Sequence, residues 1–246
     1  YRFIDIFNLN LFSKIGIALY LFIYLIFTNS TISETTKVDL RKNLEIALNS
    51  RDLEFIKDTF GEDKSLIISK KFSKIIQEFP DARWKIKRLK TDKLFEDVFR
   101  IKVFGKKIVK GEIYLLESNF NYVFSTLDGK ISKGVIKDLF TIIRNDDKKL
   151  DITFNIPDKV LTGAKYDLDI ILNNPLEEVI IAGGIKPHQV ESFLDQEIAL
   201  EPLVSGGIFK ITRAPSKPGT QIWSGIIAHP KGIITFTKSI DIVENI

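Results

Sequence analysis

Alternating hydrophobic and polar residues mark the middle of the chain, over residues 79–144, as an antiparallel sheet. Its strands are predicted over residues 84–90, 98–104, 108–116, 119–127, 130–136 and 139–144. Gly105-Lys106-Lys107 predicts a hairpin turn between the second and third of these strands. Asp128-Gly129 is a stronger turn signal, because a type I′ turn needs positive φ at both central residues. This stretch is the structural centre of the chain.

Three short amphipathic helices are predicted before the sheet. Apolar residues recur at intervals of three and four from Leu40 to Leu48, and a second such pattern runs over residues 53–60. A third candidate covers residues 65–78 and ends before Pro80, which disfavours a helical conformation in the residue ahead of it. Helices with one apolar face need a surface to cover, and the sheet supplies one.

The order of three short motifs resembles a known superfamily. Ala-Leu-Asn-Ser-Arg-Asp-Leu at 47–53 joins two helices, Phe-Pro-Asp-Ala-Arg-Trp at 79–84 opens the sheet, and Asp-Gly-Lys-Ile at 128–131 lies near its end. Together they resemble the NTF2-like superfamily, its SnoaL-like branch above all, over roughly residues 34–145. The resemblance implies an α+β fold, in which a strongly curved antiparallel sheet wraps helices into a cone.

The last 101 residues, 146–246, have a different pattern. The charged run 145–149 lacks apolar residues and predicts a domain boundary, and every apolar segment beyond it is short and bounded by turn residues. About seven short strands in such a length are typical of an immunoglobulin-like sandwich, and in general terms this part resembles the Ig-like modules of bacterial exported proteins. The expected domains are therefore 31–145, NTF2-like, and 146–246, Ig-like.

Residues 1–30 are predicted to direct export. Thirteen residues, 15–27, carry no charge, and Lys14 precedes them, as in the apolar core of a signal peptide. Adding residues 9–12 lengthens the segment enough for an uncleaved N-terminal anchor that contacts the membrane through residues 9–27. A buried helix of a soluble domain is the third interpretation. Either of the first two places the rest of the chain outside the cytoplasm, in the periplasm or an equivalent lumen.

The composition excludes several kinds of chemistry. Without cysteine the chain forms no disulfide, no thiolate nucleophile and no cysteine zinc site. Residues 151–246 carry 8 Lys and Arg against 12 Asp and Glu, which leaves 28 against 20 for residues 1–150. This change of sign between the two parts supports two domains with different surroundings.

Groups suited to proton transfer are scarce. The chain has two histidines, His188 and His229, and both are predicted to lie in surface loops. A cone would have to rely on carboxylates, with Asp97 and Glu112 nearest by position, and both are expected to be solvated strand residues. No catalytic residue, metal site or cofactor is therefore predicted.

Lysines and arginines gather beside Trp84. An ordinary solvated strand face explains this cluster, since edge lysines prevent strand pairing, while contact with anionic lipid headgroups or an acidic partner is the functional alternative. Nucleic acid is not expected as a partner outside the cytoplasm. The candidate binding residues, in the cone or on the basic strand, are Trp84, Lys85, Lys87, Lys90, Arg100, Tyr114 and Tyr122.

These observations favour an exported, membrane-tethered, non-enzymatic protein that binds a protein partner or a small apolar ligand. A small-molecule enzyme that uses carboxylates in the cone is the first alternative. The second alternative is an accessory subunit of a membrane complex.

Overall fold

A computed structural model describes residues 40–60, 72–91, 97–127, 130–146, 150–173, 180–188, 198–203 and 206–245. The predicted export segment, residues 1–30, with its membrane contact at 9–27, lies outside these residues, and so does the Asp128-Gly129 turn. No helix within the described ranges is long and apolar enough to cross a membrane.

Two predicted helices are confirmed, and a third helical segment covers residues 72–78. Helix α2 (Leu40–Ser50) buries Leu44, Ala47 and Leu48, which share one face at helical spacing. Arg51, with φ of 64°, ends this helix. Asp52 then caps helix α3 (Leu53–Phe60), because its Oδ1 accepts a hydrogen bond from the Phe55 N–H at 3.0 Å.

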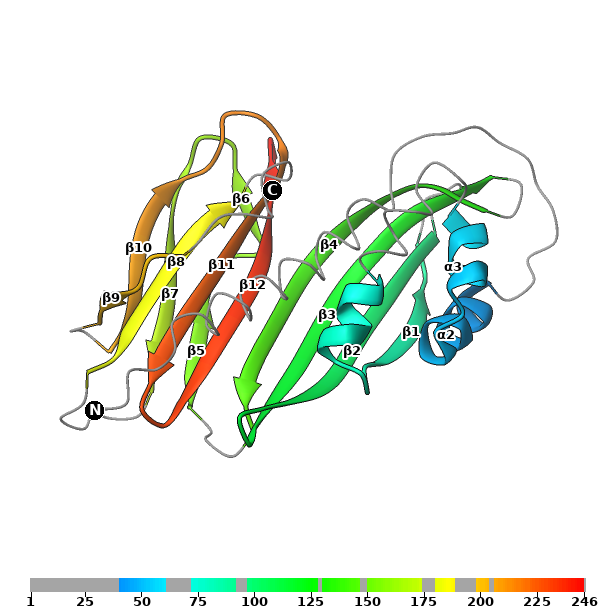
Figure 1. The fold of residues 1–246 in the computed structure, drawn as a ribbon. Helices are drawn as coiled ribbons and strands as arrows, with labels where there is room; N and C mark the ends of the chain where they lie inside the picture. The colour runs from blue at the N-terminus through cyan, green and yellow to red at the C-terminus, as the bar shows by residue number, and fades with distance from the viewer. Residues whose placement is uncertain are drawn as a thin grey trace. The chain divides into compact units, whose positions relative to one another are not determined.

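Four strands follow the helices: β1 (Arg83–Leu89), β2 (Asp97–Val109), β3 (Glu112–Leu127) and β4 (Lys130–Asn145). They lie side by side in chain order (Figure 1). The predicted turn at residues 105–107 is wrong, because β2 continues to Val109 and reverses at Lys110-Gly111, with φ of 51° and 83°. Gly105 serves close packing instead, since an added Cβ would lie 3.0 Å from the Phe79 Cβ.

Eight further strands lie among the described residues after β4. They are β5 (Ile152–Asn155), β6 (Lys159–Leu161), β7 (Lys165–Leu172), β8 (Ala182–His188), β9 (Glu201–Pro202), β10 (Gly207–Arg213), β11 (Gly219–His229) and β12 (Gly232–Val243). The hairpin predicted around residues 229–232 is confirmed, because His229 of β11 pairs with Gly232 of β12. Strands β10, β7 and β5 form a three-stranded sheet, in that order.

The predicted fold class is wrong. The chain is mostly β, and its large sheet has the order β1-β2-β3-β4-β12-β11-β8-β9, with β6 paired to β12. Residues 234–238 of β12 pair with residues 140–144 of β4, so hydrogen bonding continues past the charged run where the cone was expected to end. An α+β NTF2-like cone does not describe this arrangement. The helices, of 11 and 8 residues, are short beside strands β3 and β4, of 16 residues each.

Two compact units share the long strands. Among the described residues, one comprises those within 108–115 and 140–245, and the other comprises those within 40–107 and 116–139. The core of the first is a cluster that includes Trp223, Ile227 and Phe236, with Phe140 and Ile142 of β4 packed against it. Separate domains over residues 31–145 and 146–246 stay a prediction.

Candidate functional site

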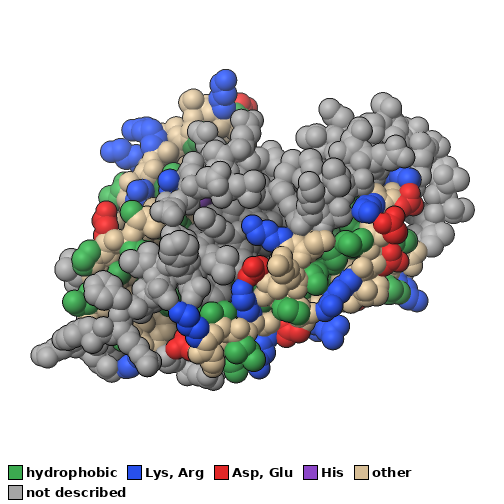
Figure 2. Space-filling model, in the orientation of Figure 1, with side chains coloured by type: hydrophobic (Ala, Val, Ile, Leu, Met, Phe, Trp, Pro, Cys, Tyr) green, Lys and Arg blue, Asp and Glu red, His purple; other side chains and the backbone are tan. Residues whose placement is uncertain are grey.

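Five exposed cations on the outer surface of β1 and β2 form what we call the basic face. Its members are Arg83, Lys85 and Lys87 of β1 and Arg100 and Lys102 of β2. Because side chains alternate along a strand, the residues between them point to the opposite side, where Trp84, Ile86 and Ile101 are buried. In the view of Figure 2, Lys and Arg side chains recur along the part of the molecule that holds β1–β4.

Like charges face each other across this pair of strands. Lys85 lies opposite Lys102, and Lys87 lies opposite Arg100. Among the described residues no carboxylate forms an ion pair with Lys85, Lys87 or Lys102. Directly opposed like charges destabilise an antiparallel pair. The basic face is therefore an arrangement that folding alone disfavours.

The basic face has a polar and an aromatic neighbour. Arg100 donates from Nε to the Asn121 Oδ1 of β3 at 3.2 Å, and the Asn121 Nδ2 donates to the Asp138 Oδ2 of β4 at 2.6 Å. Phe104, with 40% of its surface exposed, lies opposite Arg83. Phe104 is thus an exposed apolar ring at the end of the basic face.

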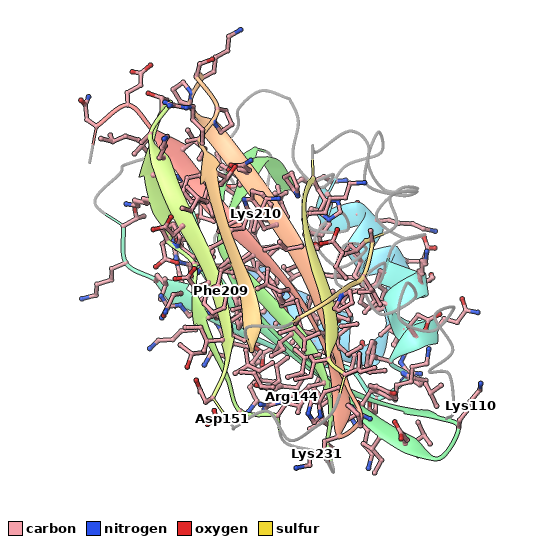
Figure 3. All side chains as sticks on the ribbon, turned by 90° about the vertical axis from the view of Figure 1, so that its left-hand side faces the viewer. Lys110, Arg144, Asp151, Phe209, Lys210 and Lys231 are labelled. Atoms are coloured by element: carbon pink, nitrogen blue, oxygen red, sulfur yellow. The ribbon has the colours of Figure 1, made fainter. Side chains whose placement is uncertain are left out.

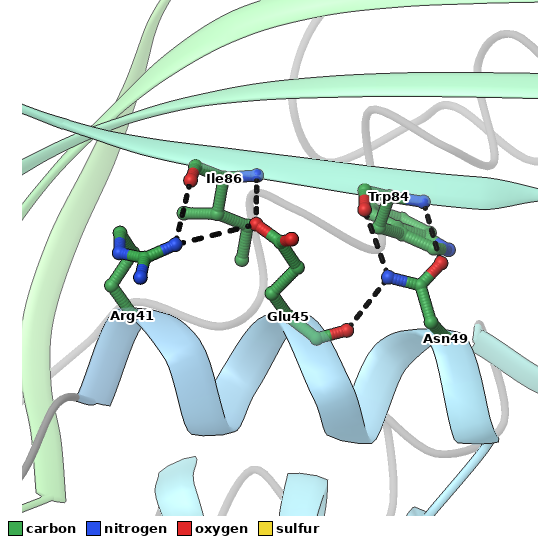
Figure 4. A network of polar contacts seen from close by, with 5 residues as sticks. All are labelled: Arg41, Glu45, Asn49, Trp84 and Ile86. Atoms are coloured by element: carbon green, nitrogen blue, oxygen red, sulfur yellow. Dashed lines mark hydrogen bonds and ion pairs between the residues drawn. The ribbon is translucent and has the colours of Figure 1, made fainter.

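Helix α2 fixes the outer edge of β1 through three polar side chains at intervals of four residues (Figure 4). The Asn49 Nδ2 donates to the Trp84 carbonyl and its Oδ1 accepts from the Trp84 N–H, at 2.8 and 2.9 Å. The Ile86 N–H donates to the Glu45 Oε2 at 2.7 Å, and the Arg41 Nη1 donates to the Ile86 carbonyl at 3.3 Å. Backbone groups that an edge strand leaves open are thus bonded, and β1 is held in place.

The structure brings together three of the seven candidate binding residues, namely Lys85, Lys87 and Arg100. Lys90 is exposed just beyond the end of β1. Arg83 and Lys102 also belong to the basic face and were not among the predicted binding residues. Lys102 could have been predicted, because it lies two residues after Arg100 on a strand of alternating pattern and so on the same side of the sheet.

The three aromatic candidates are buried core residues. The Trp84 ring packs against Phe72, with 6.0 Å between ring centroids. Tyr122 stacks on Phe124 at 4.8 Å, and burial raises the pKa of Tyr122 well above its usual value. On β3 the Tyr114 hydroxyl donates to the Glu112 Oε2 at 3.1 Å, and burial raises the pKa of Tyr114.

The two carboxylates considered for catalysis have separate partners. Asp97 forms an ion pair with Arg88. Glu112 accepts hydrogen bonds from Tyr114 and from the Asn145 Nδ2, at 3.1 and 2.8 Å, and Asn145 in turn accepts from the Ile233 N–H. Glu112 therefore belongs to a polar cluster that ties β4 to β12. The described part of the chain holds no group of three or more His, Asp or Glu side chains arranged to bind a metal ion.

Both histidines differ from the prediction of surface loops. His188 ends β8 and His229 ends β11, and they are buried, with 4% and 6% of their surface exposed. The His229 Nδ1 accepts a hydrogen bond from the Lys231 N–H at 2.9 Å. Burial, and then the charge of Lys186, lowers the pKa of His188 to about 4. His188 is therefore neutral in the folded protein at neutral pH.

This lowered pKa predicts a pH-dependent stability. Below about pH 6.5 the unfolded chain binds a proton at His188 that the folded chain binds only below about pH 4, so acid favours unfolding across this range. We expect His188 to account for a loss of about 2 kcal/mol in the free energy of unfolding between about pH 7 and pH 5. Urea unfolding at both pH values measures the loss. The variant His188→Gln should lack it and His229→Gln should retain it; equal losses in both variants would contradict the assignment.

Comparison with known proteins identifies one related region. Residues 147–243 match the model of a family described as a domain of unknown function (DUF8623). No curated protein and no solved structure matches the chain. The family match covers strands β5 to β12, so the basic face on β1 and β2 lies outside it.

Proposed function

We propose that the chain is an exported, membrane-tethered, non-enzymatic binding protein whose basic face contacts anionic lipid headgroups. The opposed pairs Lys85–Lys102 and Lys87–Arg100 are the observation that supports this most strongly. Such pairs lower the stability of the fold when the strand face is exposed to water alone. Near an anionic surface the same cations are attracted to the lipid phosphates.

Two further features favour a lipid surface over an acidic protein. The cations lie on adjacent strands of one sheet face, so several of them can reach a surface together. Phe104 adds an exposed ring at the end of the same face. The apolar segment 9–27, if it anchors the chain, would also keep β1 and β2 near a bilayer, because only a short stretch separates it from α2.

A vesicle titration tests the proposal. A chain lacking residues 1–30 should bind phosphatidylglycerol vesicles and ignore phosphatidylcholine vesicles, with weaker binding as salt is raised. Each lysine near an anionic surface contributes about 1 kcal/mol, so the triple variant Lys85→Gln, Lys87→Gln, Lys102→Gln should bind about 100-fold more weakly. Co-sedimentation with the vesicles measures the affinity, and circular dichroism checks the fold.

The matched control changes three exposed lysines elsewhere, as Lys165→Gln, Lys217→Gln, Lys231→Gln, and has the same net charge as the triple variant. It should bind nearly as well as the original chain. The basic-face variant should also unfold at the same or a higher urea concentration, because its like-charge pairs are gone. Equal loss of binding in both variants would show that net charge, and not the basic face, governs the contact.

A further inference from the structure

Strand β10 presents an open edge with apolar side chains. It ends the three-stranded sheet, and among the described residues its backbone partner is β7. Phe209 and Ile211 have 54% and 74% of their surface exposed, which is uncommon for neighbouring large apolar residues on one strand. Figure 3 labels Phe209 and Lys210 on the β10 ribbon, and the Lys210 Nζ lies 5.8 Å from the centre of the Trp223 ring on the other face.

Hydrogen bonds show which backbone groups of β10 face outward. The Leu172 N–H donates to the Gly206 carbonyl, and the Ala214 N–H donates to the Ala164 carbonyl. In an antiparallel pair the bonding positions alternate, so Ile208, Lys210 and Thr212 bond to β7. The N–H and C=O groups of Phe209 and Ile211 therefore point away from the sheet, beside their exposed side chains. Only another extended strand complements such a row.

The contrast with β1 shows that this edge is unprotected. At β1 the side chains of Arg41, Glu45 and Asn49 bond to the outer backbone groups. No side chain within the described ranges does so for Phe209 or Ile211, and β10 has apolar residues where protected edges have charges. The β1 edge is thus covered by helix α2, whereas the β10 edge keeps the features of a pairing surface.

We propose that β10 pairs antiparallel with β10 of a second copy of this chain, with Ile211 of both copies on the two-fold axis. In this register Phe209 faces the partner's Arg213, and Lys210 faces the partner's Thr212. Apolar groups then meet at the centre, each Arg213 lies by an aromatic ring, and no like charges are opposed. A register centred on Lys210 would place two ammonium groups face to face.

A second copy of β10 is a better partner than an unrelated peptide, because the strand carries both members of each pair, Phe209 with Arg213 and Ile211 with itself. Arg213 donates from Nη1 to the Gly163 carbonyl at 2.6 Å, which holds its guanidinium at the end of the strand with other N–H groups available. The outer face of the neighbouring strand β7 carries Asp167 and Asp169 opposite Ile211 and Phe209. A paired β10 of a second copy would supply Arg213 to this acidic surface.

Single cysteines test the register, because the chain has none of its own. In the full chain, purified in mild detergent, Ile211→Cys should form an intermolecular disulfide on mild oxidation, since directly opposed residues in an antiparallel pair have Cα atoms about 5.5 Å apart. Phe209→Cys should cross-link at least about tenfold more slowly, because in this register its counterpart lies far beyond disulfide reach. Thr153→Cys on β5 is the control for random collision.

Rapid cross-linking at Ile211 alone supports the proposal. Equal rates at all three positions, or faster cross-linking at Phe209, would overturn it, and so would no cross-linking at any position, which would leave the edge to a different protein. Sedimentation of the full chain without cysteines gives an independent measure. Ile211→Lys, which opposes two like charges on the axis, should weaken dimerisation at least about tenfold relative to Thr153→Lys.

Discussion

Replacing Trp223 by alanine is expected to lower the free energy of unfolding by about 4 kcal/mol, more than any other single truncation considered. The Trp223 side chain is almost fully buried, with 1% of its surface exposed, in the core cluster with Ile227 and Phe236. Its Nε1 donates to the Tyr166 hydroxyl at 3.0 Å, and this hydroxyl donates to the Gln221 Oε1 at 2.6 Å. Alanine would leave a large cavity and remove the hydrogen bond from Trp223 to the Tyr166 hydroxyl.

Urea unfolding followed by circular dichroism measures the loss. Tyr166→Phe is the matched control, because it removes the hydroxyl and keeps the ring, and should cost about 1–2 kcal/mol. Trp223→Phe should fall between the two. If Trp223→Ala cost no more than Tyr166→Phe, the hydrogen bonds and not the packing would dominate, contrary to this account. The remaining tryptophan, Trp84, belongs to the other compact unit and reports whether that unit unfolds in the same transition.

Replacing Asn49 by alanine is expected to cost about 2–3 kcal/mol, a large effect for a half-buried polar residue on a short helix. The change removes both bonds to Trp84, and each leaves a backbone group of β1 without its partner. It also breaks the attachment of α2 to the edge strand, where Glu45 and Arg41 would have to hold Ile86 without help. Chemical denaturation gives the loss.

Two variants on α2 make this test specific. Ile46→Ala truncates an exposed residue, with 55% of its surface accessible, and should change stability by less than about 0.5 kcal/mol. Asn49→Asp keeps the acceptor for the Trp84 N–H and loses the donor to its carbonyl, so it should destabilise the chain as well. An Asn49→Ala variant as stable as Ile46→Ala would mean that α2 does not secure β1.

Residue patterns predicted local structure well where a single face is buried. The spacing of Leu44, Ala47 and Leu48 gave α2, and the alternation around Trp84 and Ile101 gave β1 and β2. The turn of the β2–β3 hairpin was misplaced, because Gly105 allows close approach of Phe79 and the sharper signal, Lys110-Gly111, was not considered. A glycine signals either a turn or a close contact, and the sequence alone does not separate the two.

Strand partners could not be predicted in the same way. Alternation states which residues of a strand face the core, but it carries no information on which strand lies alongside. The pairing of β4 with β12 joins residues about ninety positions apart, and no local signal marks it. The histidines were misplaced for a related reason, since His188 and His229 end strands whose length depends on their neighbours in the sheet.

The candidate site was predictable in part. Lys85 and Lys87 were visible as a basic strand, while their opposition to Lys102 and Arg100 depends on the register between β1 and β2. Trp84, Tyr114 and Tyr122 were expected among the binding residues of the cone or the basic strand. Their burial follows from the helices and strands that pack over them, which composition does not reveal.

The most direct test of the central claim asks which surface of the full chain meets the lipid. A polarity-sensitive dye on Asn119→Cys would report from β3, the neighbour of β2, and the same dye on Thr153→Cys would report from β5. The labelled chains are reconstituted in phosphatidylglycerol or in phosphatidylcholine vesicles that carry a lipid-attached quencher. Quenching of the dye at position 119 should be stronger in phosphatidylglycerol than in phosphatidylcholine. Quenching of the dye at position 153 should be the same in both lipids. Quenching of the Asn119 dye that does not depend on anionic lipid would contradict the account.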